Sequence, residues 1–433
     1  GGAGGAAGGG AGGATEGRPR SRKLAVARAT KAGDVTIADD AEARAGVHGW
    51  RFEDRDWAPA VRALECDEEA RAGYATRKAH EYLETEATLR AKVKALADMV
   101  RVSKHVVAYT GAGISTASGI GDYASKTTKS MGAGASRPKL RTPLEAQPTL
   151  AHHVLARMYE AGCLEYWIQQ NHDGLPQKAG LPQHAINEIH GAWFDVSNPV
   201  VPMDGQLRTD LFDDLLEWEV RADLVLAMGS SLCGMNADRV ATTCAQRALN
   251  GDESAQGTVI VSLQQTQYDD IAALRIYATI DDVMALLADE LGITAAVDAA
   301  RAAGPYDLHK ALVAAGARPA AGGASDDKEA EMEHVYMVPY DPVTGKRARA
   351  GAKPMVLDLR EGAKLRLTGG MYEGDDGEVM GLMRDGHFRM QFKHCVNKKR
   401  TTRKVPFMRV LGSWWVEAAV RGTVPIIPVV NIA

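Results

Sequence analysis

Residues 111–123 have the residue types and spacing of a phosphate-binding turn. They read Gly-Ala-Gly-Ile-Ser-Thr-Ala-Ser-Gly-Ile-Gly-Asp-Tyr and follow the short apolar run 106–109, which is typical of a buried parallel strand. Gly111 and Gly113 allow the backbone to approach a dinucleotide pyrophosphate, and free N–H groups of a helix expected to begin near Ile114 would face its phosphates. Because a Gly-x-Gly pattern alone is weak, this interpretation depends on the segments that follow.

Four later segments carry polar residues suited to sugar binding and proton transfer. A histidine can act as a general base because its ordinary pKa lies near neutral pH. A lone histidine is more often an ordinary core or surface residue, however, and Asn and Asp often cap loops. In chain order the segments are Gln170-Asn171-His172-Asp173-Gly174-Leu175, Glu188-Ile189-His190-Gly191, Gly229-Ser230-Ser231-Leu232 and Ser262-Leu263-Gln264.

Together and in this order, these segments resemble the motifs of the sirtuin family. Residues 111–123 resemble its NAD-binding signature, and residues 188–191 resemble the segment that carries its catalytic histidine. The Gly-Ser-Ser turn, the ribose-binding turn and a closing helix that begins near Ile280 complete the pattern. The resemblance covers about residues 89–292, and the helices at its two ends look most like the nuclear class IV branch.

The resemblance implies an enzyme that uses NAD to remove acyl groups from protein lysines, such as those of histones. The products would be deacylated lysine, O-acyl-ADP-ribose and nicotinamide. His190 would be the general base, and Asn171 and Asp173 would hold the ribose, the nicotinamide amide and nearby water. Phosphate would be held by the backbone N–H groups of Gly111 and Gly113 and by the hydroxyls of Ser115, Ser230 and Ser231. The implied cofactor-binding residues are Gly111, Ala112, Gly113, Ser115, Asp122, Tyr123, Gln170, Asn171, Asp173, Gly229, Ser230, Ser231, Ser262, Leu263, Gln264 and Ile280.

The sequence also departs from the family pattern. Sirtuins usually carry two Cys-x-x-Cys pairs after the catalytic histidine, but residues 191–228 contain neither Cys nor His, so we expect no metal site there. The zinc module is missing near residues 195–199, either in the protein itself or through an error in the gene model. The peptide-docking segment, where a substrate adds a strand, corresponds to Met203-Asp204-Gly205.

Three substitutions near the cofactor keep other functions open. Gly121, Ala124 and His172 replace a proline, an arginine and an aliphatic residue of the family pattern. Two alternatives to deacylation therefore remain. One is mono-ADP-ribosyl transfer from the same pocket, and the other is a catalytically weak relative that binds NAD or ADP-ribose as a sensor or scaffold.

The elements that would position these residues alternate between strand and helix. Apolar spacing predicts helices over 89–104, 148–160, 210–222 and 280–291, and strands over 106–109, 164–168, 224–228 and 259–263. This alternation predicts an α/β fold, a Rossmann-like doubly wound parallel sheet with a reduced small domain, over residues 85–293.

The remaining segments differ in composition. We expect a disordered Gly/Ala-rich and basic tail over 1–35, a helical extension over 36–84 that includes a helical patch at 57–64, and a linker over 294–334. Residues 335–433 would form a small β-barrel domain, because 359–392 resembles the KOW type of SH3-like barrel, with a hairpin turn at Asp385-Gly386. A basic run would contact nucleic acid or a partner protein, or would simply be solvated, and comprises Lys393, Lys398, Lys399, Arg400, Arg403 and Lys404.

Composition limits the class and location of the protein. A net charge of −4 argues against a chain that coats nucleic acid throughout, and the absence of long apolar runs predicts no membrane partner. Five dispersed cysteines indicate reduced thiols in an intracellular compartment. The first methionine is Met99, so the N-terminus is expected to be incomplete. We expect a nuclear location, with the cytoplasm as the alternative. The basic cluster 18–23 would be a nuclear signal or a solvated tail.

Overall fold

The computed structural model describes residues 35–39, 47–70, 78–122, 125–126, 130–131, 138–202, 205–314, 334–398 and 401–432, without the side chains of 395–398 and 401–403. Several predicted features lie outside the described residues. They are residues 1–34 of the expected tail, residues 315–333 of the expected linker, Tyr123, Ala124, and Met203 and Asp204 of the expected docking segment. The side chains of 398–400 and 403 in the basic run are also outside the description. Among the described residues, no helix is both long enough and apolar enough to cross a membrane.

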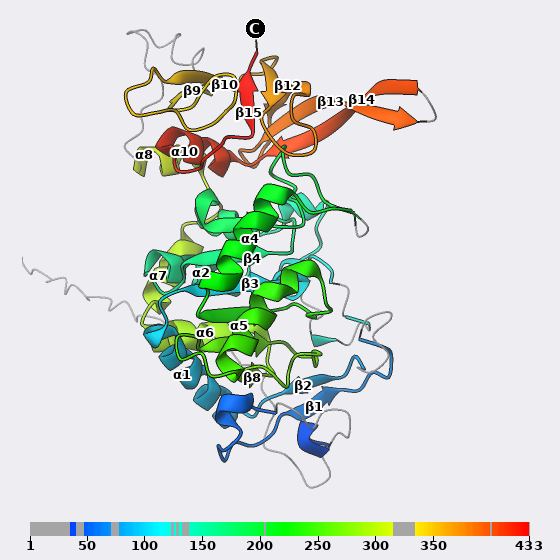
Figure 1. Ribbon diagram of the computed structural model, residues 1–433, viewed down its shortest axis with the longest axis vertical. Helices are drawn as coiled ribbons and strands as arrows, with labels where there is room; N and C mark the ends of the chain where they lie inside the picture. Colours follow the sequence, from blue (N-terminus) through cyan, green and yellow to red (C-terminus); the bar gives the residue numbers. More distant parts are fainter. Residues whose placement is uncertain are drawn as a thin grey trace, which may run out of the picture.

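A six-stranded parallel sheet forms the centre of the molecule (Figure 1). Its strand order is β5-β4-β3-β6-β7-β8. The chain builds one half outward from β3 and the other half outward from β6, so the direction of winding reverses between these two neighbours. The strands are β3 (Val106–Thr110), β4 (Tyr166–Gln169), β5 (Ile186–Glu188), β6 (Leu224–Met228), β7 (Gly257–Val261) and β8 (Leu274–Ile276). The expected doubly wound Rossmann-like sheet is confirmed.

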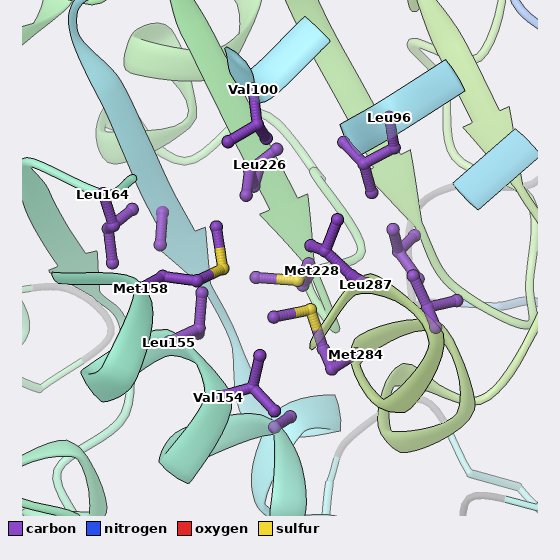
Figure 2. Close-up of a cluster of buried hydrophobic side chains, with 14 of the residues drawn as sticks. Leu96, Val100, Val154, Leu155, Met158, Leu164, Leu226, Met228, Met284 and Leu287 are labelled. Carbon is purple, nitrogen blue, oxygen red and sulfur yellow. The ribbon is translucent and has the colours of Figure 1, made fainter. Parts of the chain in front are cut away.

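Helices cover both faces of this sheet. Within β6, Leu226 and Met228 pack toward one face and Val225 and Ala227 toward the other, as the two-residue period of a strand requires. Figure 2 shows the first core, where side chains of three helices meet Leu226 and Met228. These helices are α1 (Glu86–Val102), α2 (Leu150–Glu160) and α6 (Ile280–Leu291), and the opposite face carries α4 (Thr209–Arg221) and α5 (Arg239–Leu249).

The expected helices and strands of the central domain are present, with ends shifted by a few residues. Helix α5 and strands β5 and β8 were missed. Gly111-Ala112-Gly113 leads into a 3-10 helix, Ala112–Ser118, rather than into a helix beginning near Ile114. The remaining short helices are α3 (Leu175–Lys178) and 3-10 turns at Ile37–Asp39, Trp50–Phe52, Pro143–Glu145, Gln183–Ala185 and Asn236–Asp238.

The prediction of a helical extension over 36–84 is wrong for the described part. Residues 57–64 contain strand β1 (Val61–Leu64), which pairs antiparallel with β2 (Glu81–Leu83). The extension is bound to the central domain, because the N–H of Tyr82 donates to the carbonyl of Leu263 at 2.9 Å. Tertiary pairing therefore overrode the weak helical propensity of this segment.

The prediction of a linker over 294–334 is wrong at its N-terminal end. Residues 294–302 form α7 (Thr294–Ala302), whose Val297 is buried in the same core as α1, α2 and α6. Helix α8 (Leu308–Ala314) then adds Leu312 to the core of the C-terminal domain. The alanine-rich composition was read as a spacer, although alanine also has the highest helix propensity.

The C-terminal domain is a small β domain, as expected, although its described strands pair in two open sheets rather than in the expected barrel (Figure 1). A five-stranded antiparallel sheet has the order β14-β13-β12-β11-β15, and the hairpin turn at Asp385-Gly386 is confirmed between β12 and β13. Sequence reasoning missed its helix, α10 (Ser413–Arg421). The strands are β9 (Val335–Val338), β10 (Met355–Asp358), β11 (Lys364–Leu367), β12 (Asp376–Leu382), β13 (Phe388–Lys398), β14 (Thr401–Leu411) and β15 (Val429–Asn431).

Candidate active site

The expected site residues follow the carboxyl ends of adjacent parallel strands. Gly111 follows β3, Asn171 follows β4, His190 follows β5, Gly229 follows β6 and Ser262 follows β7. Since these strands are neighbours and parallel, their ends meet at one edge of the sheet. Open α/β sheets bind ligands at this edge, at the point where the strand order reverses. Here that point lies between β3 and β6.

Glycines let the two loops at this point touch. A Cβ atom on Gly113 would lie 2.7 Å from the Cα of Gly229, and a Cβ atom on Gly111 would lie 2.9 Å from the carbonyl oxygen of Gly229. Gly229 itself has φ +63°, a conformation that favours glycine. The loops after β3 and β6 are therefore closer together than any side chain would permit.

The expected role of two backbone donors is not supported. The N–H of Gly111 donates to the carbonyl of Met228 at 3.1 Å, and that of Gly113 donates to the carbonyl of Gly229 at 2.9 Å. Both groups were expected to face phosphate, but they join the two loops instead. Here the glycines serve close packing of backbone against backbone.

Ser115, Asn171 and Asp173 form one hydrogen-bonded cluster. The Ser115 hydroxyl donates to Oδ2 of Asp173 at 2.6 Å, and the Asn171 amide donates to the same hydroxyl at 3.0 Å and to the carbonyl of Gly111 at 3.1 Å. The other Asp173 oxygen accepts from the N–H of Leu175 at 3.1 Å. Burial raises the pKa of Asp173, which is 1% exposed. Asp173 therefore positions the loops, while the half-buried Asn171 lies nearer the open edge.

Gln170 is held by two residues that sequence reasoning missed. Its amide nitrogen donates to the hydroxyl of Tyr109 and, at 3.2 Å, to Oδ1 of Asp238. Tyr109 donates to the same carboxylate oxygen at 2.7 Å, and the hydroxyl of Ser230 donates to Oε1 of Gln170 at 3.2 Å. Burial raises the pKa of Asp238. No chemical motif marked Tyr109 within an apolar strand, and Asp238 precedes the helix that was missed.

His190 lies in the turn after β5. Its carbonyl accepts from the N–H of Val201 at 2.9 Å, which ties the turn to the segment that leads to the expected peptide-docking residues. Gly191, with φ +94°, packs where a Cβ would lie 2.4 Å from the carbonyl oxygen of Pro199. Burial, and then the nearby His172, lowers the pKa of His190 to about 4. The imidazole is thus neutral at neutral pH and is able to accept a proton.

The turn after β7 is held by a residue that sequence reasoning missed. The Ser262 hydroxyl donates to the carbonyl of Gln264 at 2.5 Å, and the fully buried Arg275 donates to the carbonyls of both residues. Asp122 accepts from the N–H of Ser125 at 2.8 Å, and Ile280 begins α6. Among the expected site residues, the half-buried ones are Ala112, Gly113, Asp122, Gln170, Asn171, His190, Gly229, Ser231, Ser262, Leu263, Gln264 and Ile280.

This arrangement fits a dinucleotide. Partly exposed amide, hydroxyl and imidazole groups lie along the edge formed by the carboxyl ends of the strands, where open α/β sheets bind ligands. Among the described side chains, no group of three or more His, Cys, Asp or Glu residues is placed to hold a metal ion.

Comparisons with known proteins point to one family. No family model matches the chain. The NAD-dependent protein deacetylase sirtuin-7 of Homo sapiens is 33% identical over 263 residues, which cover 50% of this chain and 64% of that protein. An NAD-dependent protein deacetylase of Thermotoga maritima is 27% identical over 254 residues, 47% of this chain and all of that protein. The chain spans less than two thirds of the sirtuin-7 sequences it matches.

Solved structures match this chain over a similar share of its length. The structure described as "Sir2 bound to acetylated peptide" is 26% identical and covers 46% of this chain and 99% of its own, with a TM-score of 0.37. The structure described as "Sir2-p53 peptide-NAD+" is 25% identical with the same coverage and a TM-score of 0.39.

Proposed function

We propose that the central half of this chain is a member of the sirtuin family and acts as an NAD-dependent protein-lysine deacylase that forms O-acyl-ADP-ribose and releases nicotinamide. One observation carries the proposal. Gly111, Asn171 and His190 follow three adjacent parallel strands and therefore lie at one edge of the sheet, and Gly111 lies at the point where the strand order reverses. The relatives that match this part of the chain are NAD-dependent protein deacetylases.

In this proposal His190 transfers a proton, and Asn171 and Asp173 position the reacting groups. Bound NAD would supply a nicotinamide–ribose bond whose cleavage leaves a ribose carbon open to attack by the acyl oxygen of the lysine. His190, neutral at pH 7, would accept a proton from a ribose hydroxyl at a ring nitrogen. Asn171 would present its amide from a position set by Gly111 and Ser115. Asp173 would act through Ser115.

The remaining assignments come from the resemblance to sirtuins. We assign substrate docking to the segment around Gly205, a class IV-like identity with the zinc module absent, and a nuclear location.

For the C-terminal domain we propose a KOW-like module whose exposed Lys393 and Lys404 contact nucleic acid. Lys393→Glu with Lys404→Glu should then weaken RNA or DNA binding and flatten its salt dependence, as measured by fluorescence anisotropy. Unchanged binding would contradict this role, and the basic run would then dock a partner protein or simply be solvated.

Nicotinamide release from an acetylated histone peptide tests the proposed activity. We expect release by the full chain and a loss of at least about 100-fold in His190→Ala, the lower end of the range for a positioned general base. His309→Ala serves as the matched control, because His309 is exposed on α8. Equal release in both variants would contradict the role of His190.

The two alternative functions give different results in the same assay. Mono-ADP-ribosyl transfer predicts release that needs a protein acceptor but no acyl group. A sensor or scaffold predicts calorimetric binding of NAD or ADP-ribose without release.

A further inference from the structure

The loop after His190 is buried against the C-terminal domain. Phe194, 1% exposed, has its ring centroid 4.8 Å from that of His387 and 5.2 Å from that of Trp414. The N–H of Gly412 donates to the carbonyl of Phe194 at 2.9 Å. The backbone and the side chain of Phe194, four residues from the proposed base, are therefore both held by another domain.

Trp414 also reaches the loop that carries Asn171 and Asp173. Gly174 follows Asp173 and has φ +64°, and a Cβ at this position would lie 2.7 Å from Cδ2 of Phe194 and 3.1 Å from the Trp414 indole. The two rings thus pack directly on the glycine backbone. One indole contacts the loops after β4 and after β5 at the same time.

Further contacts make this interface continuous with the C-terminal core. Val196 is fully buried among the core residues of that domain, and Gly370 comes so close to the carbonyl of Ser197 that no side chain would fit. From the central domain, the Lys178 ammonium lies 4.9 Å from the centroid of the Phe194 ring and donates to the carbonyls of Leu144 and Ala146. These contacts fall where the sequence departs most from the sirtuin pattern.

We propose that the C-terminal domain holds the two loops carrying Asp173 and His190 in their working geometry, with Trp414 as the positioning residue that contacts both. The catalytic consequence rests on the proposed function, whereas the mechanical coupling does not. A misplacement of about 1 Å at a reacting group can lower a rate about 100-fold, so loosening these loops should act on turnover.

Variants of the full chain test this proposal. Trp414→Ala removes the shared contact. Trp415→Ala is the matched control, because Trp415 is the next residue of α10 and packs only partly buried against the C-terminal core. Trp414→Phe should restore most of the lost function. Phe194→Leu trims the other ring and provides a second route should Trp414→Ala not fold.

Two readouts separate this proposal from the proposed function. In Trp414→Ala, amide hydrogen exchange should rise in residues 172–175 and 190–198 but not in β6 or β7, and kcat/KM for the acetylated peptide should fall about 100-fold. We also expect the acid limb of the pH–rate profile to move upward as the imidazole becomes more exposed. If no variant releases nicotinamide, the proposed function fails, and exchange alone still decides the coupling. Unchanged exchange in these loops, or equal effects of Trp414→Ala and Trp415→Ala, would overturn the proposal.

Discussion

The Ser115 hydroxyl donates a 2.6 Å hydrogen bond to Oδ2 of Asp173 and thereby joins the loop after β3 to the loop after β4. Both residues are buried, so the carboxylate has no solvent to replace a lost donor. Ser115→Ala should lower the free energy of unfolding by about 1–3 kcal/mol, the cost of an unsatisfied buried polar group. Urea denaturation measures this, with the exposed Ser254→Ala as control. A change in Ser115→Ala no larger than the control would show that the bond does not support the site.

The glycine contact at the reversal point gives a second prediction. Gly113→Ala forces a Cβ to within 2.7 Å of Gly229, so the loops after β3 and β6 must separate. We expect a loss of about 1–3 kcal/mol in stability, as for overpacked sites, together with weaker NAD binding by calorimetry. Gly369→Ala in the C-terminal domain is the control, because a Cβ there meets nothing within 4 Å. Equal NAD affinity in the two variants would argue against a cofactor site at this contact.

Much of the central domain could be predicted because local and tertiary signals agree there. The apolar run 224–228 and the stripe of α6 are buried in the structure, and the polar motifs lie at strand ends where chemistry is expected. Gln170, Asn171 and His190 were found by their spacing within motifs. The closeness of Gln170 and Asn171 to the loop after β3 follows from the parallel order of β3 and β4, which the alternation of elements already implied, whereas β5, which carries the turn with His190, was not predicted.

The supports of the site could not be predicted, because they come from contacts distant in sequence. Asp238 binds Gln170 across 68 positions, and Arg275 holds the carbonyls of Ser262 and Gln264 from β8. Neither residue lies in a motif. The contact of Trp414 with Phe194 joins residues 220 positions apart, and no local pattern in α10 indicates that it faces another domain.

The lowered pKa of His190 predicts a pH dependence of stability. Its pKa is about 4 in the folded protein, below the ordinary 6.5, because burial disfavours the charged form. The unfolded chain therefore binds more protons between these values. The contribution of His190 is complete above pH 6.5 and is lost as the pH falls toward 4.

Comparison with His190→Asn isolates this effect from other titrating groups. Between pH 7.5 and 5.5 the wild type should lose about 1 kcal/mol more unfolding free energy than the variant, as measured by urea denaturation at each pH. The same shift places the acid limb of the wild-type pH–rate profile below pH 6.5. Parallel stability curves for the two proteins would contradict a buried, neutral imidazole.

The buried ion pair of Lys92 and Glu84 ties the N-terminal extension to the central domain. Both side chains are fully buried, with Nζ and Oε1 2.6 Å apart, and the ammonium also donates to the carbonyl of Arg275 at 2.7 Å. Burial lowers the pKa of Lys92. Lys92→Met leaves the carboxylate buried without its partner, so this variant should lose about 3–5 kcal/mol of unfolding free energy.

Lys92→Met combined with Glu84→Gln should recover most of that loss, since the uncompensated charge is gone. The exposed pair of Arg90 and Glu86, also on α1 and 2.9 Å apart, provides the control cycle with an expected coupling of about 0.3–0.5 kcal/mol. Chemical denaturation of the four proteins in each cycle gives both coupling energies. Similar coupling energies in the two cycles would mean that residues 78–84 contribute little to the stability of the central domain. A larger coupling energy for Lys92 and Glu84 would show that these residues are part of its fold.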